Sequence, residues 1–161
     1  MLRKRNAVLE SALAKLQPSV APIADLTGLD ENVTIYGTYY NRAYNRHESW
    51  SIIVSWREIF SSIAPYLVAL PNEEAVRAVL GEALWKKYNS SYGERPSIEG
   101  QSLKTVGVQL KALGLVNITY SEAVGGGMGL FWSATPSGDR LTLELRTVRS
   151  KTEKPKILPA K

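Results

Sequence analysis

Cysteine is absent from the 161-residue chain, and histidine occurs only once, at His47. Without cysteine the chain can form neither disulfides nor thiolate metal sites, which fits the reducing cytoplasm, where we expect the protein to be located. A single histidine leaves little from which to build a metal centre or a serine, histidine and acid catalytic group. We therefore expect no metal, no cofactor and no enzymatic activity in this chain.

Long apolar runs are also missing. No stretch of about eighteen apolar residues is present that could cross a membrane. The basic start LRKR leads into an amphipathic segment with Glu10 and Lys15, which is unlike the apolar centre of a signal peptide. We expect a soluble protein that is not exported and does not bind membranes. The length and an apolar content of 44% allow one hydrophobic core with appendages.

The net charge of +5 is unevenly distributed along the chain. Residues 1–16 carry a net charge of +3 and residues 140–161 carry +5. The region between them, residues 17–139, has nine basic and twelve acidic side chains. Any attraction to nucleic acid would therefore come mainly from the two ends of the chain.

The stretch 102–150 has the pattern of a helix, two strands and a closing helix. Apolar residues recur every three or four positions from Leu103 onward, and Gly114 suits the position just after a helix end. Apolar and polar residues then alternate over 116–121 and again over 130–134, on either side of a glycine-rich loop. This alternation predicts a β-hairpin.

The closing helix begins with recognisable signals. Thr135 offers a side-chain oxygen as N-cap, and Pro136 occupies the first helical position, where proline costs no hydrogen bond. The preceding loop GGGMG lacks the GK[ST] sequence of a phosphate-binding loop and joins two strands rather than a strand and a helix. We therefore expect no nucleotide site there.

Residues 1–17 are predicted to form an amphipathic helix that ends at Pro18. Three leucines are spaced by seven residues: Leu2, Leu9 and Leu16. Two interpretations remain open, a coiled-coil seam that joins two copies as a homodimer and a single helix that lies on the domain.

The segment 18–54 is predicted to hold a linker and a β-hairpin, because VTIYGTYY and SWSIIV are rich in β-branched and aromatic residues. Between these runs, Arg42 and Arg46 flank Tyr44. This basic and aromatic cluster is either a contact for phosphates and bases or an ordinary solvated hairpin loop.

Two further helices are predicted before residue 100. Ser55 and Glu58 form a capping-box pattern at the start of the first, and Pro65 falls inside it, where it predicts a kink or a helix end near Ala64. Glu73 lies in the first turn of the second, where an acidic side chain is favourable.

The chain resembles the winged helix-turn-helix superfamily, in which a helix is followed by a hairpin, the wing, and a closing segment. The matching residues are Gln109, Leu110, Leu113, Gly114, Leu115, Trp132, Ala134, Thr135 and Gly138. The run WREIFSSIAPYL over residues 56–67 also resembles the opening of a C-terminal winged-helix module in an uncharacterised bacterial family. In that family the module follows a separate signalling or nuclease-like domain.

The resemblance implies an α+β fold with a winged helix over 55–150, made of three helices, a two-stranded wing and a closing helix. An N-terminal helix over 1–17 and a β-hairpin within 18–54 would precede it, and a basic flexible tail over 151–161 would follow. The expected core residues are Trp56, Phe60, Ile63, Leu80, Leu84, Leu103, Val106, Leu110, Leu113, Ile118, Trp132 and Leu141. The connection 87–100 is longer than the three- or four-residue turn of a helix-turn-helix, and a short helical turn within it would restore the usual angle.

The resemblance also implies a protein that binds double-stranded DNA, such as a transcriptional regulator. Outward positions on the third helix would then read bases: Ser102, Lys104, Thr105, Gln109 and Lys111. Possible phosphate contacts are Arg42, Arg46, Arg146, Arg149 and Lys151.

The alternative is a non-catalytic protein-interaction or oligomerisation module of a larger bacterial signalling or defence assembly. The wing favours it, because its loop contains Glu122 and no cation, whereas Met128, Leu130 and Phe131 form an apolar group expected at the surface.

Overall fold

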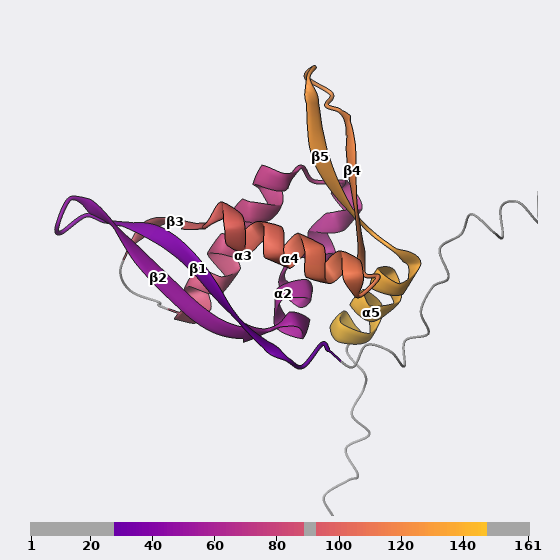
Figure 1. Cartoon of the computed structure of the whole chain (residues 1–161), viewed down its shortest axis with the longest axis horizontal. Helices are drawn as coiled ribbons and strands as arrows, with labels where there is room; N and C mark the ends of the chain where they lie inside the picture. Colours follow the sequence, from indigo (N-terminus) through magenta and orange to yellow (C-terminus); the bar gives the residue numbers. More distant parts are fainter. Residues whose placement is uncertain (1–27, 89–92, 148–161) are drawn as a thin grey trace, which may run out of the picture.

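The computed structural model describes residues 28–88 and 93–147, which adopt an α+β fold with two antiparallel sheets (Figure 1). The expected helix over 1–17, with its possible dimer seam, and the tail over 151–161 lie outside these residues. The described elements, in chain order, are β1 (Asn32–Asn41), β2 (Arg46–Ser55), α2 (Trp56–Ile63), the 3₁₀ helix η2 (Ala64–Ala69), α3 (Glu73–Tyr88), β3 (Glu94–Ile98), α4 (Gly100–Ala112), β4 (Val116–Glu122), β5 (Met128–Ala134) and α5 (Pro136–Arg146).

The first sheet has the strand order β2-β1-β3. The hairpin of β1 and β2 was expected, but β3 was not, because the connection between the second and third helices was expected to be a loop with a short helical turn. Pro96 lies within β3, as an edge strand allows, and Arg95 has a positive φ of 52°. The sequence signal for this strand is therefore weak, and its pairing with β1 is what defines it.

Gly37 allows the three strands of this sheet to approach one another. A β-carbon at this position would lie 2.5 Å from the carbonyl oxygen of Ser97 on β3 and would also overlap the indole of Trp50 on β2. That indole donates a hydrogen bond to the carbonyl of Thr38, at 3.1 Å. Only glycine leaves room for Trp50 under β1 and for β3 beside it.

The local helix signals are present in the structure. Ser55 and Glu58 form the capping box of α2, and Thr135 caps α5 by accepting a hydrogen bond from the backbone of Gly138. The chain changes to the 3₁₀ helix η2 at Ala64, immediately before Pro65, so the proline ends α2 rather than kinking it.

The segment that follows η2 is attached to the second sheet, which consists of β4 and β5. The backbone N–H of Trp132 on β5 donates to the carbonyl of Pro71, at 2.9 Å, and Asn72 forms a bridge with Phe131. The turn between η2 and α3 therefore borders the edge of β5.

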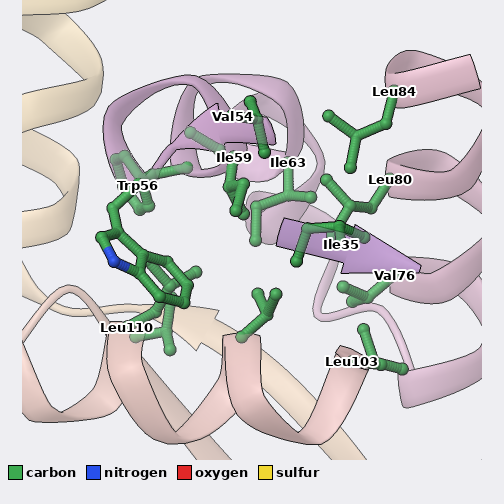
Figure 2. Packing of buried hydrophobic residues seen from close by; sticks show 14 of the residues in the cluster. Ile35, Val54, Trp56, Ile59, Ile63, Val76, Leu80, Leu84, Leu103 and Leu110 are labelled. Carbon is green, nitrogen blue, oxygen red and sulfur yellow. The ribbon is translucent and has the colours of Figure 1, made fainter. Parts of the chain in front are cut away.

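One hydrophobic core joins the three-stranded sheet, the helices and the second hairpin, which is formed by β4 and β5. Figure 2 shows side chains from α2, α3, α4 and the β1–β2 hairpin pointing toward one another, with Leu110 of α4 beneath Trp56. Leu110 is fully buried, whereas the expected core residues Leu113 and Ile118 are only partly buried. Because Ile35 of β1 belongs to the same cluster, the first hairpin and the helices form one packing unit.

Candidate interaction surface of α4 and the second hairpin

The outward side of α4 is formed by Lys104, Thr105, Val108 and Lys111, which are all exposed. Val108 has 71% of its surface exposed, although it is apolar. The hydroxyl of Thr105 donates to the carbonyl of Gln101, at 3.0 Å, within the helix. Three of the five predicted base-reading residues therefore share one exposed side.

The other two predicted residues of α4 lie differently. Gln109 is half-buried. Ser102 is buried, with 8% exposure, and its hydroxyl accepts a hydrogen bond from the backbone N–H of Tyr36 on β1, at 3.2 Å. The expectation that Ser102 points outward is wrong, because this side chain connects α4 to the first sheet.

Gly107 determines how closely α4 approaches the β4–β5 hairpin. A β-carbon at this position would lie 3.0 Å from Cδ1 of Ile118 and 3.2 Å from the ring of Trp132. Lys104 precedes Gly107 by three positions and Lys111 follows it by four, so both lysines lie on the same side of the helix as Gly107. The two lysines of α4 therefore lie one turn before and one turn after Gly107 along the helix.

The β4–β5 hairpin extends past the core, so the face that packs against the core at its base continues into solvent. Ile118 pairs with Trp132, Tyr120 with Leu130 and Glu122 with Met128. Because paired positions two residues apart share one face of a sheet, Tyr120, Leu130 and Met128 lie on the face that contacts α4 at its base. They are exposed by 65%, 37% and 55%, respectively. These three residues are referred to below as the hairpin stripe.

Phe131 does not belong to the hairpin stripe. It pairs with Thr119 on the opposite face of the hairpin and is partly buried. The expectation that Phe131 forms one exposed group with Met128 and Leu130 is therefore wrong, because the alternation along β5 turns its side chain to the other face.

The hairpin carries almost no charge. From residue 116 to residue 134 there is no lysine or arginine, and Glu122 is the one acidic side chain. The turn contains Gly126 and Gly127 at positive φ values of 89° and 81°, which suit glycine. Figure 1 shows this hairpin projecting away from the helices, and Glu122, which pairs with Met128, lies on the same face as Tyr120 and Leu130.

The predicted phosphate contacts of the first hairpin are paired with carboxylates. Arg42 lies 3.3 Å from Glu94, and Arg46 lies 2.9 Å from Glu48. The guanidinium of Arg46 also lies 5.3 Å from the ring centre of Tyr44, so the basic and aromatic cluster does form. Its positive charge is compensated locally, which weakens the attraction of this loop for phosphate.

Glu48 is the centre of this polar group. The hydroxyl of Tyr39 donates to it at 2.5 Å, and Asn41 and Arg46 donate as well. These hydrogen bonds, the one from Tyr39 foremost, lower the pKa of Glu48 to about 2. Glu48 is therefore ionised at neutral pH.

The remaining predicted phosphate contacts are at the C-terminal end. Arg146 is exposed at the last turn of α5, and its guanidinium donates to the carbonyl of Ser61, at 3.0 Å. Arg149 and Lys151 lie outside the described residues. Among the described residues, no contact joins Arg146 to the arginines of the first hairpin.

The sequence prediction did not include Val108 or Tyr120 in a site. A signal for Val108 was available, because it falls outside the apolar spacing of Leu103, Val106 and Leu110 on the same helix. The alternation of apolar and polar residues along β4 places Tyr120 on the same face as the core-facing Ile118. Tyr120 is exposed because the hairpin extends past the core at this point.

Within residues 28–88 and 93–147, no three histidine, aspartate or glutamate side chains lie close enough together to hold a metal ion. In the same part of the chain, no helix is both long and apolar enough to span a membrane. Comparisons with protein-family models, with curated proteins and with solved structures found no match to this chain.

Proposed function

We propose that residues 55–150 form a winged-helix module that binds a protein partner through α4 and the wing formed by β4 and β5. The order of α2, α3, α4, hairpin and α5 supports the winged-helix assignment, as does the packing of Gly107 against the base of the hairpin. The strand β3 between α3 and α4 is a departure from the helix-turn-helix pattern. In this proposal the chain is a non-catalytic interaction module of a larger bacterial signalling or defence assembly.

The hairpin stripe is the observation that carries this proposal. Apolar and aromatic side chains that project from a hairpin into water are typical of the centre of a protein interface. Lys104 and Lys111 on the exposed side of α4 would supply polar contacts at the rim. A surface that grips DNA would need cations on the wing, and residues 116–134 contain none.

The experiment uses a photo-crosslinking amino acid in place of Tyr120, with the same amino acid in place of Ile53 as the control. Ile53 is equally apolar and exposed by 70%, but it lies on β2 in the first sheet. We expect position 120 to crosslink a specific protein in the source cell, and the double substitution Met128→Ser and Leu130→Ser to abolish that crosslink. Identical crosslinks from positions 120 and 53 would contradict the proposal.

Reading of DNA by α4 is the second candidate, because Lys104, Thr105 and Lys111 are exposed together. If this candidate holds, Lys104→Gln weakens binding to all duplexes alike and flattens the salt dependence by about one phosphate contact. Thr105→Ala would reduce the preference between bases by about 1 to 3 kcal/mol if the contact is a good one. Failure of the full chain to bind duplex DNA at low salt would remove this candidate.

A further inference from the structure

Strand β2 has an open outer edge within the part of the chain that the structure describes. The first sheet has the strand order β2-β1-β3, so β2 forms one edge and β3 the other. All ten residues of β2 pair with β1 in an unbroken register. Figure 1 shows β2 at the border of the molecule, with no labelled element beyond it. An edge strand of this kind leaves every second backbone N–H and C=O group without a partner in the sheet.

The hydrogen bonds of Tyr36 on β1 show which backbone groups of β2 are free. The N–H of Tyr36 donates to the hydroxyl of Ser102, and its carbonyl accepts from the N–H of Glu99, so both groups point away from β2. Because this direction alternates along a strand, the odd-numbered residues of β1 bond to β2, and their partners are the even-numbered residues of β2. The N–H of Trp56, which donates to the carbonyl of Glu31, continues this pattern. The free groups belong to four residues, which we term the β2 edge: His47, Ser49, Ser51 and Ile53.

The opposite edge of the same sheet is protected against the addition of a strand. Strand β3 has only five residues, contains Pro96 and pairs irregularly with β1. The guanidinium of Arg77 donates to the carbonyl of Ile98, the last residue of β3, at 2.7 Å. Short length, proline and irregular pairing are common means of protecting an edge. The stretch 49–55 of β2 has none of these features, because it pairs regularly and contains no proline, glycine or charged residue.

Glu48 disfavours a second copy of this chain as the occupant of the β2 edge. Two copies of β2 would pair antiparallel about a two-fold axis, with paired side chains on the same face. Every such register that pairs both Ser49 and Ser51 places Glu48 opposite an apolar residue of the second copy. Depending on the register, this residue is Trp50, Ile52, Val54 or Trp56. Glu48 is ionised, since its pKa is about 2, and contact with an apolar side chain would remove water from it without compensation.

The chemistry of the β2 edge identifies its partner. A row of alternating donors and acceptors is complementary to the backbone of an extended polypeptide. A strand from another protein can place a polar side chain opposite Glu48 and apolar side chains beside Trp50 and Ile52, which face the core. We propose that the β2 edge binds an extended segment of another protein, which adds to the first sheet as a fourth strand.

The test is the selection of peptides from a displayed library of random sequences of about ten residues, the upper length of a typical strand, with the full chain as the target. We expect the selected peptides to carry apolar residues at alternate positions. Ser51→Pro removes an N–H that points away from β1, so it should weaken peptide binding roughly tenfold or more while the melting temperature changes little. Ser51→Thr is the matched control, because it keeps the N–H and should bind as the unchanged protein does. Methylation of alternate N–H groups of the peptide should also abolish binding, with no change to the chain.

Amide hydrogen exchange of the full chain locates the bound peptide. The N–H groups of Ser49, Ser51 and Ile53 should exchange rapidly in the free protein and slowly when the peptide is bound. Those of Trp50 and Ile52 should exchange slowly in both states, because they bond to β1.

Two results would overturn the proposal. One is slow exchange at Ser49, Ser51 and Ile53 in the free protein, since the edge would then already be covered. If that protection grows with protein concentration, a second copy covers the edge; if it does not, another part of the same chain does. The other is a selection that yields no peptide whose binding is sensitive to Ser51→Pro.

The β2 edge and the wing are different surfaces, so these results do not depend on the proposed function. Ile53 belongs to the β2 edge, and a crosslinking amino acid at this position should therefore capture a different protein from one at Tyr120. Loss of the crosslink at position 120 would remove the proposed function alone, and loss of peptide binding at the β2 edge would remove this inference alone.

Discussion

Gly107 of α4 lies against the indole of Trp132 on β5, so closely that a β-carbon at position 107 would come within 3.2 Å of the ring. Trp132 is fully buried, and its partner across the hairpin, Ile118, meets the same side of Gly107. This contact sets the distance between the helix that bears Lys104 and Lys111 and the hairpin that bears the exposed stripe. The geometry of the proposed binding surface therefore depends on having glycine, which has no side chain, at position 107.

Replacing Gly107 by valine should force α4 and the hairpin apart. Overpacking of a close contact costs about 1 to 3 kcal/mol of unfolding free energy, which urea denaturation measures. Gly100→Val is the matched control in the same helix, because no atom lies within 4 Å of a β-carbon there. Equal stability of the two variants would show that the contact at Gly107 is not tight.

Replacing Gly37 by alanine tests the three-stranded sheet. The added methyl group would collide with the indole of Trp50 and with the carbonyl of Ser97, so we expect a loss of about 1 to 3 kcal/mol and faster hydrogen exchange in β3. Gly129→Ala serves as the control, because its nearest neighbour, the ring of Phe131, is at an ordinary 3.6 Å. Unchanged exchange in β3 would contradict the close approach of β1 and β3.

Glu48 should make the first hairpin sensitive to acid. Its pKa in the folded chain is about 2, below the ordinary value of 4.5, chiefly because of the hydrogen bond from Tyr39. A lowered pKa means that the stabilisation is fully present above about pH 4.5 and is lost as the pH falls through about 2. Glu48→Gln should remove this part of the pH dependence of the melting temperature.

The control for that measurement is Glu82→Gln, on the exposed side of α3. It should retain the same loss of stability between pH 4.5 and pH 2 as the unchanged protein. If Glu48→Gln and Glu82→Gln give identical pH profiles, the hydrogen bonds to Glu48 contribute nothing measurable.

Leu110 is completely buried on α4, beside the core residues of α2 (Figure 2). Leu110→Ala should lower the unfolding free energy by about 2 to 5 kcal/mol, because it removes buried surface and leaves a cavity. Val108→Ala, on the exposed side of the same helix, should change it by about 0.5 kcal/mol or less. Similar losses at both positions would contradict the burial of this helix face.

Sequence signals located the elements whose causes are local. The capping box at Ser55, the cap at Thr135 and the left-handed Gly114 lie within a few residues of the backbone groups they affect. Alternation likewise predicted the hairpin around the glycine turn. These features need no knowledge of distant parts of the chain, which is why they could be predicted.

The features that could not be predicted depend on distant contacts. The short β3 contains Pro96 and owes its extended form to pairing with β1, about sixty residues earlier. The hydrogen bond that Ser102 accepts from the backbone of Tyr36, sixty-six residues away, is one such contact. The burial of Ser102 could have been predicted, because its spacing from Val106 and Leu110 places it on their side of the helix. The exposure of Tyr120 depends on how far the hairpin extends past the core, and no local pattern records that length.

The most direct test of the account is a fluorescence titration of the full chain with duplex DNA of mixed sequence at several salt concentrations. We predict weak binding that disappears near physiological salt. The double substitution Lys104→Gln and Lys111→Gln should leave this binding unchanged. Replacing the basic residues of 1–16 and 148–161 by glutamine should abolish it. Tight, sequence-selective binding that the double substitution abolishes would contradict the claim that α4 and the wing bind protein.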